Sequence, residues 1–410
     1  MAGGIYPQIS HTCLPEKAHR TPERTRRTGV RRQGFADLIL KNQRNLWMDF
    51  CSFTLKTEEP NFLFYLYTCG EVKSMQPTFV IAGKLNREYI LPPSGQPLLD
   101  SPGGSLLYAA GGLAVWDSNA GLIGRVGEDY PRQWVRDFEE YGFDTSGIRT
   151  LRELQNVDLR TFIAFTDSNE RSYSNAVSHF ARRQLPFPKS LLGYQPPDES
   201  RKDPREPEPV SPAALDVPKD YWNVRYVHLC PFDFVSQSQM VNLFRGGSDQ
   251  TVSLDPAPGY MSPTFWRDLR LVLQGVTVFQ PSEDELRALF WGETNDLWEM
   301  ARKVSEFGPR IIVIKRGSHG QMVYDVPGSH RYEIPAYPSR LVDPTGAGDA
   351  FCGGFLAGFQ KTNDPLMAAL HGSVSASLKI EGSGPFYELG VLPGLAEARL
   401  YALKEMAREI

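Results

Sequence analysis

Two glycines and an acid stand where a loop becomes a helix in the run Leu341-Val342-Asp343-Pro344-Thr345-Gly346-Ala347-Gly348-Asp349-Ala350-Phe351. Phe351, Phe355 and Phe359 then recur every four residues, a spacing that predicts an amphipathic helix. The first turn of a helix has amide N–H groups without intrahelical partners, and the helix macrodipole adds partial positive charge there. Because the two glycines let the backbone approach an anion, the junction predicts a phosphate site.

The acid in this run indicates chemistry on a proton. A phosphate would repel a carboxylate that faces it, so Asp349 is better explained as a general base for a substrate hydroxyl. Removing that proton while the backbone of Gly346, Ala347, Gly348 and Asp349 stabilises a transferring phosphoryl group is what a kinase requires. The alternative is a glycine-rich helix cap with a capping Asp. A lone Gly-x-Gly-Asp would favour that alternative, but the length of the run favours catalysis.

The run resembles the C-terminal signature of the ribokinase-like carbohydrate kinases, also called the PfkB family. The usual form is Asp-Thr-x-Gly-x-Gly-Asp-x-Phe, and Pro344 replaces the first Thr here. The resemblance spans about residues 75–410 and implies an α/β ribokinase-like fold, with a mostly parallel sheet, helices on both faces and a small β lid. It also implies use of ATP with Mg²⁺. In potassium-activated relatives, carbonyls of the turn found here at 382–385 and the acid found here at Asp343 hold K⁺ near the anion hole.

Composition narrows the class of protein only broadly. The chain has 410 residues, 41% hydrophobic and 22% charged, which allows a sizeable core in one large domain or two. A net charge of −4 gives no reason to expect nucleic acid as a partner. The scattered cysteines lack Cys-x-x-Cys spacing, which argues against disulfides or zinc and fits a cytoplasmic protein. The longest apolar stretch near the start is far shorter than the ~20 residues of a membrane-spanning helix, and no secretory signal is evident.

The first 74 residues differ from the rest. Their basic cluster lies among Pro, Thr and Gln without a helical or strand period, so we expect a disordered extension. We hypothesise that the functional protein begins near Met75, just before the first good strand. A transit peptide, weakened by several acids, and a nucleic-acid-binding arm are the sharper alternatives. The cluster consists of Arg24, Arg26, Arg27, Arg31 and Arg32.

From Phe79 onward, short apolar runs alternate with amphipathic stretches, which predicts a parallel sheet covered on both faces. By resemblance, the kinase domain is 75–410, with lid strands from about 79–92 and 159–177. The stretch 185–220, rich in Pro and charge, indicates a surface insertion. The expected strands are 79–83, 226–230, 251–255, 276–280 and 311–315. The expected helices are about 129–141, 263–273, 296–307, 349–360 and 393–409.

Ligands of an open parallel sheet gather at the carboxyl ends of its strands. After the strand 276–280, Ser282 and Glu285 predict a capping box, which leaves Glu283 unexplained by capping. Glu283 matches the Glu of the family's Asn-x-x-Glu motif, which by resemblance organises Mg²⁺ through water, and Gln280 replaces the Asn. The alternative is that Glu283 only favours the helix dipole. The other nucleotide-binding residues expected are Lys315, Gly317, Ser318, Gly320 and Ser373.

The acceptor side is expected at two glycine-containing segments. Residues 83–88 resemble the family's Gly-x-x-Asn-x-Asp pattern, with the longer Glu88 as the acid that gathers sugar hydroxyls. Residues 102–104 resemble the Gly-Gly turn that enters a helix, but Ser105 and Tyr108 replace the Lys and Asn of ribokinases, which argues against ribose. Tyr108 either stacks on a substrate ring or packs in the core. The expected acceptor contacts are Asn86, Glu88, Gly103, Gly104 and Tyr108, with Asp349 as base.

These patterns predict an ATP-dependent kinase that phosphorylates an alcohol group of a small sugar, polyol or nucleoside. The lid would exclude water, so that phosphate goes to the alcohol. No membrane partner is expected, nucleic acid is disfavoured, and a homodimer is an open option. Two alternatives stay open: a ribokinase-like protein that binds or regulates without catalysis, and an arginine-rich nucleic-acid binder that rests on the N-terminal cluster alone.

Overall fold

The structure, a computed structural model, describes residues 76–166, 170–196, 203–246 and 249–410. These residues belong to one compact unit, Lys73–Ile410. The expected extension 1–74, with its arginine cluster and the start near Met75, lies outside the described residues. The ideas of a transit peptide and of a nucleic-acid-binding arm therefore stay predictions.

A ten-stranded, mostly parallel sheet runs through the described part of the chain. Its strands are β1 (Phe79–Ala82), β4 (Ala120–Val126), β5 (Asp144–Thr150), β8 (Tyr226–Leu229), β9 (Thr251–Leu254), β10 (Val278–Phe279), β11 (Ile311–Lys315), β12 (Gln321–Asp325), β13 (His330–Ile334) and β14 (Arg408–Glu409). Their order across the sheet is β14-β13-β12-β11-β10-β9-β8-β1-β4-β5. The strands from β5 across to β11 are parallel, and β12, β13 and β14 add antiparallel strands at one edge. The carboxyl ends of the parallel strands therefore share one edge of the sheet.

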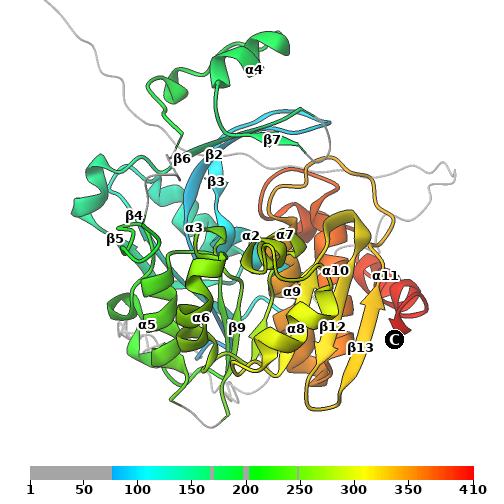
Figure 1. Cartoon of the computed structure of the whole chain (residues 1–410). Helices are drawn as coiled ribbons and strands as arrows, with labels where there is room; N and C mark the ends of the chain where they lie inside the picture. Colours follow the sequence, from blue (N-terminus) through cyan, green and yellow to red (C-terminus); the bar gives the residue numbers. More distant parts are fainter. Residues whose placement is uncertain (1–75, 167–169, 197–202, 247–248) are drawn as a thin grey trace, which may run out of the picture. The chain divides into compact units, whose positions relative to one another are not determined.

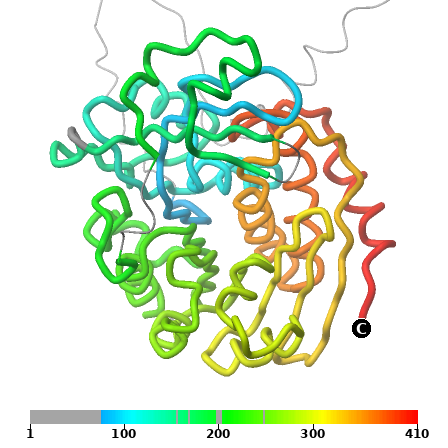
Figure 2. Tube along the Cα trace, turned by 45° about the horizontal axis from the view of Figure 1, so that its top comes forward, coloured from blue at the N-terminus to red at the C-terminus, as the bar shows by residue number. Residues whose placement is uncertain are grey.

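Helices pack on both faces of this sheet (Figure 1). They are α2 (Ser105–Ala114), α3 (Arg132–Glu140), α5 (Phe234–Phe244), α6 (Trp266–Leu273), α7 (Glu283–Leu289), α8 (Leu297–Ser305), α9 (Ala347–Thr362), α10 (Pro365–Lys379) and α11 (Leu395–Lys404). Alternate residues of β1 point to opposite faces, so that Val80 joins the core under α5 to α8 and Ile81 the core under α2 and α9. Figures 1 and 2 both show α9 beside α10. None of the helices in the described ranges is long and apolar enough to cross a membrane.

A second, four-stranded sheet is formed by β2 (Asn86–Leu91), β3 (Leu98–Gly103), β6 (Arg160–Phe165) and β7 (Arg171–Ser172). Its order is β3-β2-β6-β7, with β2 antiparallel to β3 and parallel to β6. Tyr89 and Phe162 pack against Phe180 of α4 (Ala176–Arg182), the helix at the top of Figure 1. The expected lid segment 79–92 belongs only partly to this sheet, because β1 pairs with β4 and β8 in the main sheet.

The expected alternation of strands and helices is confirmed, and each expected strand is present, although β10 covers only Val278–Phe279 of the expected 276–280. One helix is wrong at its C-terminal end. The expected helix 393–409 stops at Lys404, and β14 follows because its two residues pair with Tyr332 and Glu333 of β13. Local sequence favours a continued helix there, and pairing with a distant strand overrides it.

The described part of the stretch 185–220 is not only a surface insertion. Leu191 packs in the core of the smaller sheet, and Val217 packs in the core of the main sheet. Short 3₁₀ turns at Lys189–Leu191 and Ala214–Asp216 bring these apolar side chains onto the sheets. A segment rich in Pro and charged residues can therefore contain single apolar side chains that pack in a core.

Candidate active site

Gly346 is the point where the predicted loop becomes the predicted helix. It is the N-cap of α9, with a φ of 73° in the left-handed region that favours glycine. A Cβ at this position would lie 2.1 Å from Cγ of Tyr108. Both the backbone conformation and the neighbouring ring therefore require glycine at the entrance to α9.

The first turn of α9 leaves backbone amides available for an anion. The amides of Gly346 and Gly348 have no backbone acceptor within the described ranges. Ala347, which the sequence analysis also places in the anion hole, differs, because its N–H donates to the O of Pro344 at 3.2 Å. In this conformation the N–H groups of Gly346 and Gly348 can donate to a phosphoryl oxygen, whereas the N–H of Ala347 already donates to Pro344.

Asp349 lies in the same first turn, with a half-buried side chain. Loss of water around the carboxyl raises the pKa of Asp349 to about 7, and the charge of Glu88 acts in the same direction. The positive charges of Lys315 and Arg171 oppose this rise in pKa. A carboxyl that titrates near neutral pH can accept a proton from a hydroxyl and release it again, as a general base must.

Lys315, the last residue of β11, forms a buried ion pair with Asp255, which directly follows β9. The two side chains are 14% and 4% exposed. A Cβ on Gly348 would lie 3.7 Å from Nζ of Lys315, so the ammonium lies against the first turn of α9. Burial raises the pKa of Asp255 to about 6, although the charge of Lys315 lowers it. The pair therefore brings a fixed positive charge to the candidate anion hole at the first turn of α9.

Glu283, the first residue of α7, takes part in two ion pairs. Its Oε1 pairs with Arg287 at 2.7 Å, and its Oε2 pairs with Arg316 at 3.2 Å. Partial burial opposes ionisation, but hydrogen bonds from these arginines lower the pKa of Glu283 overall. The predicted capping box is confirmed, since Ser282 Oγ accepts from the Glu285 N–H and Glu285 Oε2 accepts from the Ser282 N–H. Glu283 is therefore not needed for capping.

Two side chains expected to bind the nucleotide are buried and bonded elsewhere. Gln280 is fully buried, and its Nε2 donates to Oγ of Ser253 at 2.6 Å. Ser373 donates to the O of Ala369 at 2.7 Å and accepts a hydrogen bond from Gln321. Each residue lies on the expected segment, but spacing does not distinguish an inward side chain from an outward one. In this structure both side chains stabilise the protein itself.

The turn after β11 borders a hollow in the surface. Gly317 and Gly320 have φ values of 54° and 79°, and a Cβ at Gly320 would lie 2.0 Å from the O of Ile334. Ser318, between them, is exposed. The hollow has a volume of about 550 Å³, a size typical of small-molecule pockets. Its lining residues are Arg316, His319, Gln321, Glu333, Ile334, Pro335, Glu405, Met406 and Arg408.

Glu88, the acid expected to gather acceptor hydroxyls, is only 3% exposed. Its Oε1 accepts from the Gly104 N–H at 2.8 Å, and its Oε2 accepts from the Tyr108 hydroxyl at 2.6 Å. A Cβ at Gly103 would lie 2.0 Å from Cδ of Glu88, so the Gly-Gly turn makes room for this carboxylate. Loss of water raises the pKa of Glu88 to about 7, although both hydrogen bonds lower it. Glu88 thus supports the turn, while Asn86, at the start of β2, is half-buried.

Of the two alternatives for Tyr108, the structure has the one in which it packs in the core. The side chain is 2% exposed, and its ring lies against the backbone of Gly346. Nζ of Lys379 lies 5.3 Å from the centroid of the ring. Tyr108 therefore contacts both Glu88 and the N-cap Gly346, and so connects the candidate acceptor side to the candidate anion hole.

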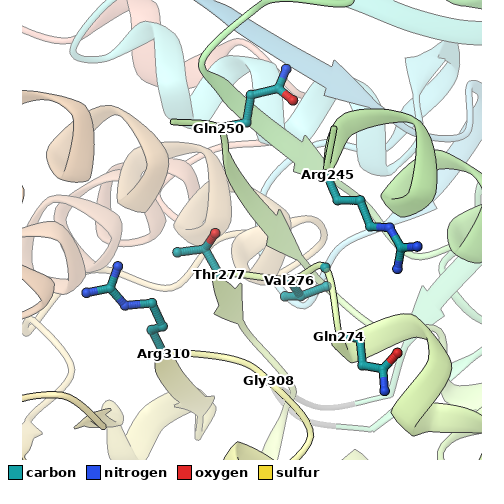
Figure 3. A pocket seen from close by; sticks show the side chains of 8 residues that line it. Arg245, Gln250, Gln274, Val276, Thr277, Gly308 and Arg310 are labelled. Atoms are coloured by element: carbon teal, nitrogen blue, oxygen red, sulfur yellow. The ribbon is translucent and has the colours of Figure 1, made fainter. Parts of the chain in front are cut away.

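Another hollow, of about 430 Å³, lies at the opposite edge of the main sheet (Figure 3). Its lining residues precede β9, β10 and β11, so it lies at the amino ends of these parallel strands. Figure 3 shows Arg245 and Arg310 on either side of Thr277 and Val276. This hollow is therefore separate from the carboxyl edge where Asp255 and Lys315 meet.

Three charged residues near the site are absent from the sequence-based set. Asp255 directly follows a strand, the position at which ligand-binding residues of an open parallel sheet gather. Arg171 lies on β7 of the smaller sheet, and its charge acts on Asp349. Lys379, at the end of α10, donates to the backbone O of Asp343. Only Asp255 could have been found from its position after a strand.

The chain is similar to known carbohydrate and nucleoside kinases. The family model described as pfkB family carbohydrate kinase matches residues 246–388. The chain is 26% identical over 286 residues to the cytidine kinase of Thermococcus kodakarensis, covering 69% of this chain and 88% of that protein. It is 28% identical over 282 residues to the ATP-dependent ribose-1-phosphate kinase of Halopiger xanaduensis, covering 68% of this chain and 80% of that protein.

Solved structures show the same fold. An Escherichia coli protein described as a ribokinase II, in complex with ATP and Mg²⁺, superposes with a TM-score of 0.58 at 19% identity. The superposition covers 79% of this chain and 98% of that protein. The main sheet with helices on both faces is thus ribokinase-like, as the sequence predicts. The chain carries a pfkB family carbohydrate kinase domain.

Proposed function

We propose that this kinase transfers the γ-phosphate of ATP to an alcohol group of a small sugar, polyol or nucleoside, with Asp349 as general base. The observation that carries the proposal is the position of Asp349. Its carboxyl, with a pKa of about 7, lies in the same helical turn as the unoccupied amides of Gly346 and Gly348. The acceptor hydroxyl can lose its proton to Asp349 while the amides stabilise the transferring phosphoryl group.

Lys315 adds the second electrostatic element. Its ammonium lies against the same turn and is held by the buried carboxylate of Asp255. A charge fixed before the reaction stabilises a developing phosphoryl charge without reorganisation. Lys315 thus strengthens the anion hole, and it also holds the pKa of Asp349 below the value that burial alone would give.

Mg²⁺ would enter with ATP and would neutralise charge on its phosphates. Glu283 is the carboxylate that we propose acts on the ion. Both of its oxygens pair with arginine, Arg287 and Arg316, a donor set that fits contact through metal-bound water better than direct ligation. The nucleotide base would occupy the hollow beside the turn 316–321, which lies at the same edge of the sheet.

A sugar or nucleoside acceptor is supported by the relatives named cytidine kinase and ribose-1-phosphate kinase. Because Glu88 is already bonded to Gly104 and Tyr108, we propose that the acceptor contacts the backbone of the Gly103-Gly104 turn and the side chain of Asn86. The smaller sheet would then exclude water from the site. A cytoplasmic location belongs to the same proposal and fits the free, buried thiols of Cys230 and Cys352.

The test is a screen of sugars, myo-inositol and nucleosides for acceptor-dependent release of ADP, with the Asp349→Asn variant as control. The proposal expects at least one acceptor to raise ADP release above the background of ATP hydrolysis in the native protein and not in the variant. If no acceptor raises ADP release, the non-catalytic alternative, a binding or regulatory protein of the same fold, is favoured.

A further inference from the structure

Lys379, the last residue of α10, has a completely buried side chain. Its Nζ donates to the backbone O of Gly382 at 3.0 Å and to the backbone O of Asp343 at 3.2 Å. The carboxylate oxygen Oδ2 of Asp343, also completely buried, lies 4.0 Å away. The ammonium group is therefore surrounded by two carbonyl oxygens and a carboxylate.

Burying an ammonium is unfavourable unless hydrogen bonds and opposite charges compensate. Loss of water lowers the pKa of Lys379 overall, and the charges of Asp343, Glu388 and Glu88 oppose this fall. Glu388 is 1% exposed, and its carboxylate oxygens have no hydrogen-bond partner among the described residues. Lys379 is thus a buried cation that interacts electrostatically with a cluster of buried acidic side chains.

The two carbonyls that accept hydrogen bonds from Lys379 belong to segments that meet behind the anion hole. The N–H groups of Val342 and Asp343 both donate to the O of Ile380, at 2.8 and 3.1 Å. Oδ1 of Asp343 accepts from the N–H of Thr345 at 3.0 Å, and Thr345 directly precedes the N-cap of α9. A cation that fixes Asp343 therefore fixes the chain that leads into the first turn of α9.

The ring of Tyr108 provides a second connection. Nζ of Lys379 lies 5.3 Å from the centroid of this ring, a distance at which a cation is attracted to an aromatic face. The same ring packs against the backbone of Gly346, and its hydroxyl donates to Glu88. One buried ammonium thus supports both the phosphate side and the acceptor side of the site.

Backbone carbonyls and a carboxylate form the kind of oxygen set that coordinates a monovalent metal cation such as K⁺. In this chain an ammonium fills that set. We propose that Lys379 acts as a tethered monovalent cation that positions the loop from Asp343 to Gly346, so that phosphoryl transfer does not require K⁺. This inference rests on the proposed kinase function. In it, Lys379 takes the place of the K⁺ that potassium-activated relatives hold at the position of Asp343. Because the Lys379 side chain is completely buried and would contact neither ATP nor the acceptor, Lys379 is a positioning residue.

The first measurement uses the native protein. ADP release with a responsive acceptor is compared in buffers where K⁺ is replaced by tetramethylammonium at constant ionic strength. The proposal expects the same kcat in both buffers, because the chain supplies its own cation. A kcat that falls about tenfold or more without K⁺ would overturn it.

The second measurement uses Lys379→Ala, which empties the oxygen set. We expect kcat to fall by about tenfold or more and to recover when NH₄⁺ or K⁺ is added, but not with tetramethylammonium, which is too large for the vacated space. In Lys379→Met the side chain fills the space without a charge, so activity should be low and should not recover. Lys361→Ala is the matched control, because Lys361 also donates to one backbone carbonyl from the last turn of a helix but is exposed. Loss of activity in Lys379→Ala without recovery would contradict the proposal.

Thermal unfolding measures cation binding at the Lys379 site without any need for catalysis. If the native protein phosphorylates none of the acceptors, the proposed function fails, but NH₄⁺ or K⁺ should still raise the melting temperature of Lys379→Ala selectively over the native protein. Equal effects of the cations on the two proteins would overturn the inference on its own. If Lys379→Ala folds only when NH₄⁺ or K⁺ is present, that dependence supports it.

Discussion

The hydroxyl of Tyr108 donates a hydrogen bond of 2.6 Å to Oε2 of Glu88, and both side chains are buried. This bond connects the helix that follows the Gly-Gly turn to the strand that begins the smaller sheet. The ring of the same tyrosine forms the surface on which Gly346 packs. The geometry of the proposed acceptor side and that of the proposed anion hole therefore depend on one residue.

Tyr108→Phe should lower the free energy of unfolding by about 1 to 3 kcal/mol, because it leaves a buried carboxylate oxygen without its donor. Urea denaturation at neutral pH measures the change. Tyr401→Phe is the matched control, since Tyr401 is 73% exposed and should lose almost nothing. Equal stability of the two variants would show that the bond to Glu88 contributes little.

The stability of the protein should depend on Asp349 in a pH-dependent way. Its pKa is about 7 in the folded protein and 3.8 ordinarily, so between these values the folded state binds the proton more tightly than the unfolded state. Folding stability therefore falls as pH rises through this window. Asp349→Asn should match the native protein near pH 4 and exceed it at pH 8, by on the order of 1 kcal/mol after solvent screening. Denaturation curves at both pH values check the prediction, and a variant that is less stable at pH 8 would contradict it.

The rate of the reaction should also depend on the protonation of Asp349. As the pH rises through about 7, Asp349 loses its proton and becomes able to act as a base, so kcat/KM should rise with an acidic limb near that pH. A pH profile of acceptor-dependent ADP release measures the limb. Lys379→Met tests a different residue and should lower the profile without abolishing the limb. A profile that stays flat from pH 5 to 9 would remove a group of this pKa from the mechanism.

The buried pair of Lys315 and Asp255 should separate stability from catalysis. Lys315→Met leaves the Asp255 carboxylate buried without its partner and should cost about 3 to 5 kcal/mol of stability. The double variant Asp255→Asn/Lys315→Met removes both charges and should recover most of that loss, as denaturation would show. Turnover should stay low in both variants, because the anion hole has lost its fixed charge. Recovery of turnover in the double variant would mean that the pair only stabilises the fold.

Glu283→Gln should mainly weaken the interaction with MgATP. Removing the carboxylate that Arg287 and Arg316 hold in place should raise the KM for MgATP more than it lowers kcat, by about 10-fold to 100-fold in kcat/KM. Asp284→Asn is the matched control, since Asp284 lies in the same helical turn but is exposed. If both variants change the KM alike, Glu283 acts only through the helix dipole.

The sequence predicts the parts of the site that depend on local structure. The junction at Gly346 and the capping box at Ser282 follow from residues within one helical turn, and both are present. Side-chain direction is not local, so Gln280 and Ser373 lie on the expected segments but point into the protein. Their partners come from other elements, which spacing alone does not identify.

Long-range pairing determines the contacts that sequence patterns do not reveal. Lys379 is separated from Asp343 by a complete helix pair, and a lysine at the end of a helix is usually explained by the helix dipole. Glu88 resembles a ligand-binding acid by its motif, but the neighbouring Gly104 and Tyr108 occupy it. A motif indicates that a residue type is needed at a position, and the fold determines whether it meets a ligand or another side chain.

Turnover by Asp349→Asn tests most directly whether Asp349 removes the acceptor proton beside the proposed anion hole. With a responsive acceptor, turnover should fall by a factor of ~10² or more while the affinity for ATP stays unchanged. Asp364→Asn, which alters an exposed acid that caps the next helix, should keep native turnover. Near-native turnover in Asp349→Asn, with ATP still bound, would contradict the account.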